Sequence, residues 1–110
     1  MPKPDVFAAI GDPTRRQILL LLTGGAMSVS TLAENFDVSR PAVSKHIKTL
    51  EQTKLISITD AGRERYCALN PEGFNEIKDW LAFYEQFWKQ KLKNLGDLLN
   101  NTYNNKKSKK

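Results

Sequence analysis

The chain has 110 residues, of which 40% are hydrophobic and 26% are charged, which indicates one globular domain and excludes a collagen-like or wholly disordered chain. Its longest aliphatic run, residues 18–22, is too short to span a membrane, and the N-terminus MPKPDVF lacks the apolar stretch of a signal peptide. A single cysteine excludes an intramolecular disulfide and a Cys-rich metal site. We therefore expect a cytoplasmic protein.

The net charge of +5 comes mostly from one end of the chain. Four lysines lie in the last five residues, so without them the net charge falls to +1 (5 − 4). We predict that residues 101–110 form a basic disordered tail behind a single domain of residues 1–100. The local balance is more informative, because residues 39–65 hold six Lys and Arg side chains against three acids.

Two helices are predicted near the start of the chain, over residues 5–10 and from Asp12 to the Gly24-Gly25 pair. Asp12 is the expected N-cap of the second helix, and Pro13 takes its first position. The expected buried stripe consists of Ile18, Leu19 and Leu22. Of the adjacent Arg15 and Arg16, we expect one to pair with an acid; a phosphate contact is the alternative for the other.

A helix-turn-helix is predicted over residues 31–50. Residues 28–30 form a short extended bridge, and Thr31 with Glu34 has the spacing of a capping box for a helix that ends near Phe36. Its inner face would comprise Leu32, Ala33 and Phe36. A three-residue connection then leads into the second helix, SRPAVSKHIKTL, residues 39–50.

This second helix has one apolar face and one face suited to nucleic acid. Val43, Ile47 and Leu50 have the i, i+4, i+7 spacing of a buried stripe. The N-cap Ser39 and Pro41 in the first turn leave backbone amides free at the helix start, where anions bind. The outward side chains are hydroxyls and cations, which suit phosphates and base edges. The alternative is a surface helix with incidental charge.

A β-hairpin follows directly, with strands over residues 55–59 and 64–69 joined by residues 60–63. Gly62 supplies the positive φ that a tight turn needs. Arg63 at the tip and Arg65 beside it are placed to follow a DNA backbone or to enter a minor groove. The alternative is that both arginines decorate a solvated turn.

Asn70-Pro71 opens a last helix that we expect to end near Leu99. Its apolar residues step by three or four, and five large aromatics lie between residues 80 and 88. Such a stripe would be exposed on a monomer, so we expect a second copy to cover it. A ligand-binding aromatic box is the alternative.

Cys67 lies on the second hairpin strand and is expected to be a small apolar filler. Redox sensing through this thiol is the alternative, although one thiol has no intramolecular resolving partner. His46 is expected to contact a phosphate or a base, with a packed position on the flank of the helix as the alternative.

Three segments resemble the ArsR family of winged helix-turn-helix repressors: residues 10–16 (IGDPTRR), residues 39–50, and residues 62–66 (GRERY). The resemblance covers about residues 6–95. It implies a mainly α fold with a small β-hairpin and a long C-terminal dimerisation helix. It also implies a homodimer, paired through the first and last helices, that binds an operator in double-stranded DNA near its own promoter and blocks transcription.

The expected site residues follow from the helix face, the wing and this resemblance. For DNA binding they are Ser39, Arg40, Pro41, Ser44, Lys45, His46, Lys48, Arg63 and Arg65. For the dimer interface they are Val6, Phe7, Ile10, Trp80, Phe83, Tyr84, Phe87 and Trp88. The symmetry of a dimer predicts an inverted-repeat operator.

No metal or cofactor is expected. The family's thiolate sensors carry Cys-Val-Cys where this chain has Ser28-Val29-Ser30, and hydroxyls are poor ligands for soft metals. The zinc sensors use His on the C-terminal helix, whereas the one histidine here is His46. The chain is closer to metal-independent, SdpR-like autorepressors, which are regulated by a partner protein or by no ligand that sequence reveals.

Two other functional classes compete with a repressor. A winged helix can serve as a protein-interaction module, which would bind independently of DNA sequence and salt. An enzyme has little support, because the sequence holds neither a phosphate-binding Gly-rich loop nor a nucleophile with its His and acid partners.

Overall fold

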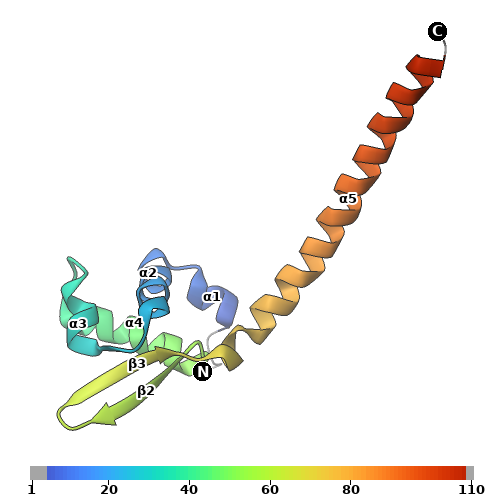
Figure 1. The fold of residues 1–110 in the computed structure, drawn as a ribbon. Helices are drawn as coiled ribbons and strands as arrows, with labels where there is room; N and C mark the ends of the chain where they lie inside the picture. The colour runs from blue at the N-terminus through green and yellow to red at the C-terminus, as the bar shows by residue number, and fades with distance from the viewer. Residues whose placement is uncertain (1–4, 109–110) are drawn as a thin grey trace. The chain divides into compact units, whose positions relative to one another are not determined.

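The computed structural model describes residues 5–108 and the side chains of residues 5–101. The helices are α1 (Val6–Ile10), α2 (Pro13–Leu21), α3 (Val29–Glu34), α4 (Arg40–Gln52) and α5 (Asn75–Ser108), with 3-10 turns η1 (Leu22–Gly24) and η2 (Pro71–Phe74). The strands are β1 (Met27–Ser28), β2 (Ile56–Ala61) and β3 (Glu64–Leu69) (Figure 1). This is the mainly helical winged helix-turn-helix with a long last helix that the sequence predicts.

The chain divides into two compact units, one that ends at Ile77 and one that begins at Lys78. The expectation of a single domain over residues 1–100 stays a prediction. Within the described residues, every buried core side chain and every apolar side chain packed on that core precedes Lys78. The first unit, hereafter the winged-helix unit, therefore holds the hydrophobic core.

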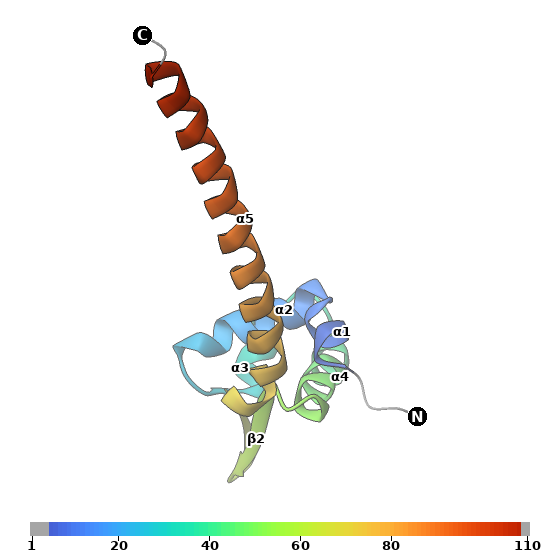
Figure 2. The same cartoon turned by 90° about the vertical axis from the view of Figure 1, so that its right-hand side faces the viewer.

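The core of the winged-helix unit is built from α1 to β3. Figure 2 shows α1 beside α2 and α4, and all three helices are in contact with one another. Burial of each large aliphatic side chain contributes about 1.5–3 kcal/mol. The buried apolar residues are Val6, Ala9, Ile18, Leu19, Leu22, Leu32, Val43, Ile47, Leu50, Leu55, Ile56 and Cys67.

The start of α2 confirms the predicted cap. The Asp12 side chain accepts a hydrogen bond from the Arg15 amide at 3.0 Å, and Pro13 takes the first helical position. The hydrogen bond from the Arg15 amide is the main cause that lowers the pKa of the Asp12 carboxyl below its ordinary value of 3.8. Ile18, Leu19 and Leu22 are buried as predicted.

The expected ion pair of Arg15 or Arg16 is wrong. Each guanidinium instead donates to carbonyls at the end of α1, and neither makes an ion pair with an acid of the described residues. Arg15 reaches the carbonyls of Ala8 and Ala9, and Arg16 reaches that of Ile10 at 2.7 Å. A helix of five residues leaves its last carbonyls without intrahelical partners, and the two arginines satisfy them.

The start of α3 differs from the prediction. Ser28, not Thr31, is its N-cap: the Ser28 hydroxyl accepts a hydrogen bond from the Thr31 amide at 3.0 Å and donates to the Thr31 hydroxyl at 2.8 Å. The helix therefore begins at Val29 and ends at Glu34. Ser and Thr both cap helices well, so residue type alone does not decide which of the two is the N-cap. Ser28 takes this role because its pairing with Tyr66 holds it in extended conformation directly before the helix.

The helix α4 begins and packs as predicted. Ser39 is its N-cap, with its hydroxyl 3.3 Å from the Ala42 amide, and Val43, Ile47 and Leu50 are buried. The helix extends to Gln52, two residues beyond the expected end, and Lys54 then takes a left-handed φ of 64°. The Leu55 amide donates to the Leu50 carbonyl at 3.0 Å, which closes the helix as a Schellman motif.

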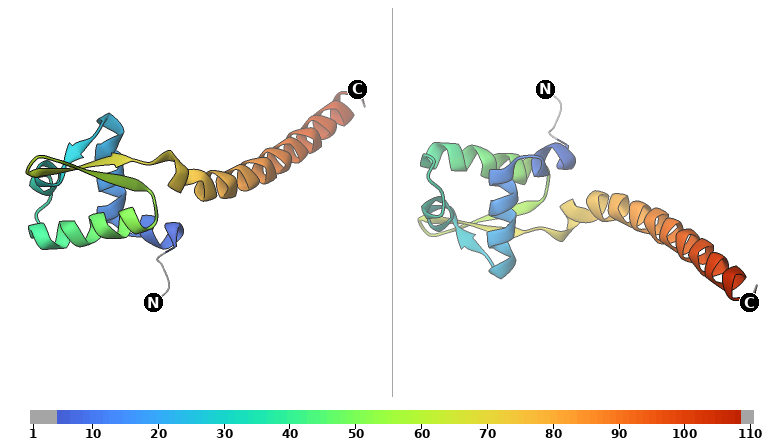
Figure 3. Two further views of the ribbon diagram at one scale, coloured as in Figure 1. Left: turned by 90° about the horizontal axis from the view of Figure 1, so that it is seen from below. Right: turned by 90° about the horizontal axis from the view of Figure 1, so that it is seen from above.

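The hairpin belongs to a three-stranded antiparallel sheet in the order β1-β3-β2. Ile56 pairs with Leu69 at one end and Ala61 with Glu64 at the other, so the turn is Gly62-Arg63, shorter than predicted. Gly62 has a φ of 64°, as the turn was predicted to need. Figure 3 shows α4 along the hairpin, and α4 is in contact with β2.

The helix α5 runs further than the sequence predicts, through Ser108 rather than to about Leu99. The backbone of residues 101–108 is thus helical where we expected a disordered tail, since neither Pro nor Gly interrupts the chain after Gly96. Residues 109 and 110 of that tail lie outside the described residues. No helix in the described part of the chain is both long enough and apolar enough to cross a membrane.

Replacing Gly73 by alanine should destabilise the winged-helix unit. A Cβ at Gly73 would overlap the backbone carbonyl of Lys54, which cannot move without disturbing the end of α4. We expect Gly73→Ala to lower the free energy of unfolding by about 1–3 kcal/mol, measured by urea or thermal unfolding. Gly24→Ala is the matched control, because a Cβ there meets no atom within 4 Å. Equal stability of the two variants would contradict the close packing of Gly73.

Cys67 should be unreactive in the folded protein. Its side chain is fully buried, and burial raises the pKa of the thiol, which disfavours the reactive thiolate. We expect an alkylating reagent at neutral pH to modify Cys67 only after denaturant is added, as followed by mass spectrometry. Rapid modification of the folded protein would favour the redox-sensing alternative.

Candidate nucleic-acid interface

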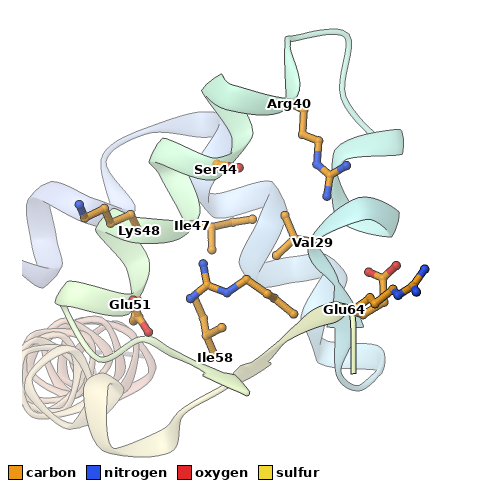
Figure 4. A pocket seen from close by; sticks show the side chains of 10 residues that line it. Val29, Arg40, Ser44, Ile47, Lys48, Glu51, Ile58 and Glu64 are labelled. Atoms are coloured by element: carbon orange, nitrogen blue, oxygen red, sulfur yellow. The ribbon is translucent and has the colours of Figure 1, made fainter. Parts of the chain in front are cut away.

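A cavity of about 500 Å³ lies between α4 and the β2–β3 hairpin of the winged-helix unit (Figure 4). We call it the reading groove. Five residues predicted from sequence to bind DNA line it: Arg40, Ser44 and Lys48 from α4, and Arg63 and Arg65 from the hairpin. The other lining residues are Val29, Ile47, Glu51, Ile58 and Glu64.

The α4 side of the reading groove presents a hydroxyl and two cations along one helix face. Arg40, Ser44 and Lys48 are spaced by four residues, so the 3.6-residue repeat aligns them, and all three are exposed. The Arg40 guanidinium donates to the Ser30 hydroxyl at 3.0 Å, a contact that tethers the start of α4 to α3. Ser30 is therefore a positioning partner that the sequence did not reveal.

The hairpin side holds Arg65 against Asp60, which lies directly opposite it in the strand register. The Arg65 Nε and the Asp60 Oδ1 are 3.1 Å apart. Both side chains are more than 60% exposed, so the pair contributes at most about 1 kcal/mol and can exchange for a phosphate. Arg63 is exposed in the two-residue turn at the tip.

Two acids and an apolar floor complete the reading groove, and the sequence analysis missed both. Glu51 follows Ser44 by seven residues and Lys48 by three, so helical spacing alone could have placed it on the same face. Glu64 lies between the two hairpin arginines, where no spacing rule marks it. The lining carries four cations against two acids, a net charge of +2 (4 − 2).

The other predicted DNA-binding residues do not line the reading groove. Ser39 serves as the N-cap of α4, and Pro41 and Lys45 are exposed on the same helix. His46 lies on the flank of α4, where its Nδ1 is 3.2 Å from the Arg15 guanidinium and 3.8 Å from the Asp12 carboxylate. The structure thus gives His46 contacts within the protein, which the sequence analysis held as the alternative to a DNA contact.

The predicted interface residues fall into two sets. Val6 is 8% exposed and packs in the core of the winged-helix unit, which leaves little of it for a partner, whereas Phe7 and Ile10 are half-buried. Along α5, the five aromatics between residues 80 and 88 are 41–66% exposed. Several of these rings contact one another along the helix; Phe87 and Trp88, for example, meet edge to face with 5.3 Å between their centroids.

The two serines in place of the family's thiolates both have structural partners. Ser28 caps α3, and Ser30 accepts the hydrogen bond from Arg40. Among the described residues, no three His, Cys, Asp or Glu side chains lie close enough together to hold a metal ion.

Comparison with known proteins agrees with this geometry. Residues 10–59 match the family model described as a helix-turn-helix domain. The chain is 42% identical over 77 residues to the transcriptional repressor SdpR of Bacillus subtilis, covering 70% of this chain and 86% of SdpR. It is 36% identical over 97 residues to the HTH-type transcriptional regulator Rv2034 of Mycobacterium tuberculosis, covering 87% of this chain and 88% of that protein.

Solved structures give the same result. An ArsR family transcriptional regulator aligns with a TM-score of 0.69 at 40% identity, covering 76% of this chain and 87% of that one. An ArsR-like transcriptional regulator from Rhodococcus sp. RHA1 aligns with a TM-score of 0.65 at 31% identity, covering 84% and 88% of the two chains. The chain belongs to the ArsR family of winged helix-turn-helix transcriptional regulators.

Proposed function

We propose that the protein is a homodimeric repressor that binds an inverted-repeat operator in double-stranded DNA. The observation that carries this proposal is the reading groove, which gathers five predicted DNA-binding side chains from two separate elements. Four cations, Arg40, Lys48, Arg63 and Arg65, lie around this one cavity. In this proposal α4 lies in the major groove and the hairpin follows the flanking backbone or minor groove.

The exposed face of α4 has the chemistry that base reading needs. Arg40 and Lys48 donate hydrogen bonds and carry charge, so they can contact guanine acceptors or phosphates, and Ser44 can contact either type of base edge. The same face leaves Lys45 free to reach a phosphate, since it is exposed and lies outside the reading groove. Sequence specificity then comes from the base contacts, and affinity comes largely from the phosphate contacts.

Dimerisation rests on the apolar surface of α5. Tyr84, Trp88, Leu92 and Leu95 are exposed at spacings of three or four residues, which is the pattern of a helix-pairing seam. A second copy of this chain would cover that seam and give the complex two-fold symmetry. Two half-sites about one helical turn, 34–36 Å, or a multiple of it apart would follow.

Repression is supported by the relatives. SdpR is named a transcriptional repressor, and the similarity covers 86% of its length. A dimer on an operator would exclude RNA polymerase, and an operator in the protein's own promoter would make it an autorepressor. As the resemblance to metal-independent, SdpR-like repressors implies, release would depend on a regulatory protein partner or on no ligand at all.

Replacing Lys48 by alanine should weaken binding to the cognate operator. If Lys48 reads a base, we expect the variant to lose about 1–3 kcal/mol of binding free energy. If Lys48 contacts the DNA backbone, we expect the slope of log affinity against log salt concentration to be smaller by about 1. Fluorescence anisotropy with labelled duplex at several salt concentrations measures both. Lys93→Ala is the matched control, because it removes the same charge from an exposed position on α5, outside the reading groove. Binding insensitive to DNA sequence and to salt would favour the protein-interaction module instead.

Acidic substitutions on the α5 seam should separate the dimer. We expect Tyr84→Asp with Trp88→Asp to yield folded monomers in sedimentation velocity, because a buried seam cannot hold two carboxylates. Gln17→Asp with Gln52→Asp is the matched control, since it adds the same charge at two exposed positions of the winged-helix unit, outside α5. A dimer that survives the first pair would show that the interface lies elsewhere.

A further inference from the structure

The Arg15 side chain connects the end of α1 to the recognition helix α4. Its Nε donates to the Ala9 carbonyl at 2.7 Å, and one terminal nitrogen donates to the Ala8 carbonyl at 3.2 Å. The other terminal nitrogen lies 3.2 Å from the Nδ1 atom of His46. A planar guanidinium can make all three contacts at once, because its donors point in fixed, divergent directions.

In the neutral ring, the contact with Arg15 decides which nitrogen of His46 carries the proton. A guanidinium has donors and no acceptor, so the Nδ1 atom of His46 must accept the hydrogen bond from Arg15. The neutral imidazole then carries its proton on Nε2. The Asp12 Oδ2 atom is 3.8 Å from Nδ1, beyond hydrogen-bond distance, so in the neutral ring Arg15 is the hydrogen-bond partner of Nδ1.

A neutral ring in this tautomer has a hydrogen-bond donor at Nε2. The His46 side chain is 25% exposed, so that donor belongs to a side chain that solvent and ligands can still reach. Phosphate oxygens and most base edges in the major groove accept hydrogen bonds. The opposite tautomer would present an acceptor, which a phosphate cannot use.

We propose that Arg15 is a positioning residue for DNA binding, which holds His46 on α4 as an Nε2–H donor while tying α4 to the end of α1. The effect of Arg15 on DNA binding rests on the proposed function. The contact between Arg15 and His46 is present in the protein without DNA. Arg15 itself is half-buried and its three described contacts lie within the protein, so it acts on DNA through His46 and through the placement of α4.

Arg16 provides a matched control within the same helix. It also donates to a terminal carbonyl of α1, that of Ile10, and it carries the same charge. Its described contacts do not include α4. Arg15→Met and Arg16→Met therefore each remove one positive charge and a side chain that caps α1. Only Arg15→Met also removes the contact with His46.

The first experiment reads the tautomer in the free protein. His46 is the only histidine, so a long-range ¹H–¹⁵N correlation spectrum contains one imidazole and needs no assignment. We expect a pyrrole-type Nε2 and a pyridine-type Nδ1 in the wild type and in Arg16→Met. In Arg15→Met we expect averaged nitrogen shifts as the tautomers exchange. Averaged shifts in the wild type, or no change in Arg15→Met, would overturn the proposal.

The second experiment is a double-mutant cycle on DNA binding. We expect Arg15→Met to weaken binding to the cognate operator about tenfold, and the same change in a His46→Ala background to have an effect of about twofold or less. Arg16→Met should also stay within about twofold of the wild type. Additive effects of Arg15→Met and His46→Ala would overturn the proposed action through His46.

Two further observations separate the possible failures. If Arg15→Met unfolds, as circular dichroism would show, Arg15→Lys replaces it. An ammonium group keeps the charge but donates from a single atom, whereas Arg15 reaches its three partners from three separate nitrogens. If the wild type binds no DNA, both the proposed function and the proposed role of Arg15 in DNA binding are contradicted. The wild-type nitrogen spectrum still decides the Arg15–His46 contact in that case.

Discussion

The rotation of α4 about its own axis is the constraint on which the candidate interface depends. Val43, Ile47 and Leu50 are at most 3% exposed and pack in the core of the winged-helix unit. Turning the helix by one residue would bring these side chains to the surface, at about 1.5–3 kcal/mol each. The core therefore decides which side chains face outward. The exposed positions then hold Arg40, Ser44 and Lys48, so the same sequence period that builds the core also builds the candidate DNA-binding surface.

The width of the reading groove depends on the backbone at the end of α4 rather than on the charged side chains that line it. Lys54 adopts a left-handed conformation, the Leu55 amide returns to the Leu50 carbonyl, and the chain enters β2 directly afterwards. Gly73 packs against the Lys54 carbonyl, which fixes this reversal from the other side. The cations from α4 and from the hairpin face one cavity because this short connection holds the two elements together. Mutual repulsion among those cations would separate a less constrained pair.

Much of this unit could be predicted from sequence, because its strongest features are local. The α4 stripe, the caps at Asp12 and Ser39, and the turn at Gly62 each follow from spacing or from one residue type. The failures involve partners distant in sequence. Ser28 caps α3 because β1 pairs with β3, and Arg15 satisfies α1 carbonyls and His46 rather than an acid. In the candidate site, the outward cations were predictable, whereas the Ser30 contact and the acids of the reading groove needed the fold.

The charge of the reading groove explains why DNA binding would require two copies. Four cations face two acids, and each phosphate neutralised contributes a slope of only about −0.9 in log affinity against log salt. Glu51 and Glu64 repel phosphates. In the proposed complex the DNA backbone would therefore run along the arginine and lysine side chains, and base edges would occupy the part of the reading groove near the two acids. In the proposed complex, one winged-helix unit would therefore hold DNA weakly and in one preferred orientation. Two copies paired through α5 would double the number of contacts, and the spacing between them would then select an operator that neither copy could select alone.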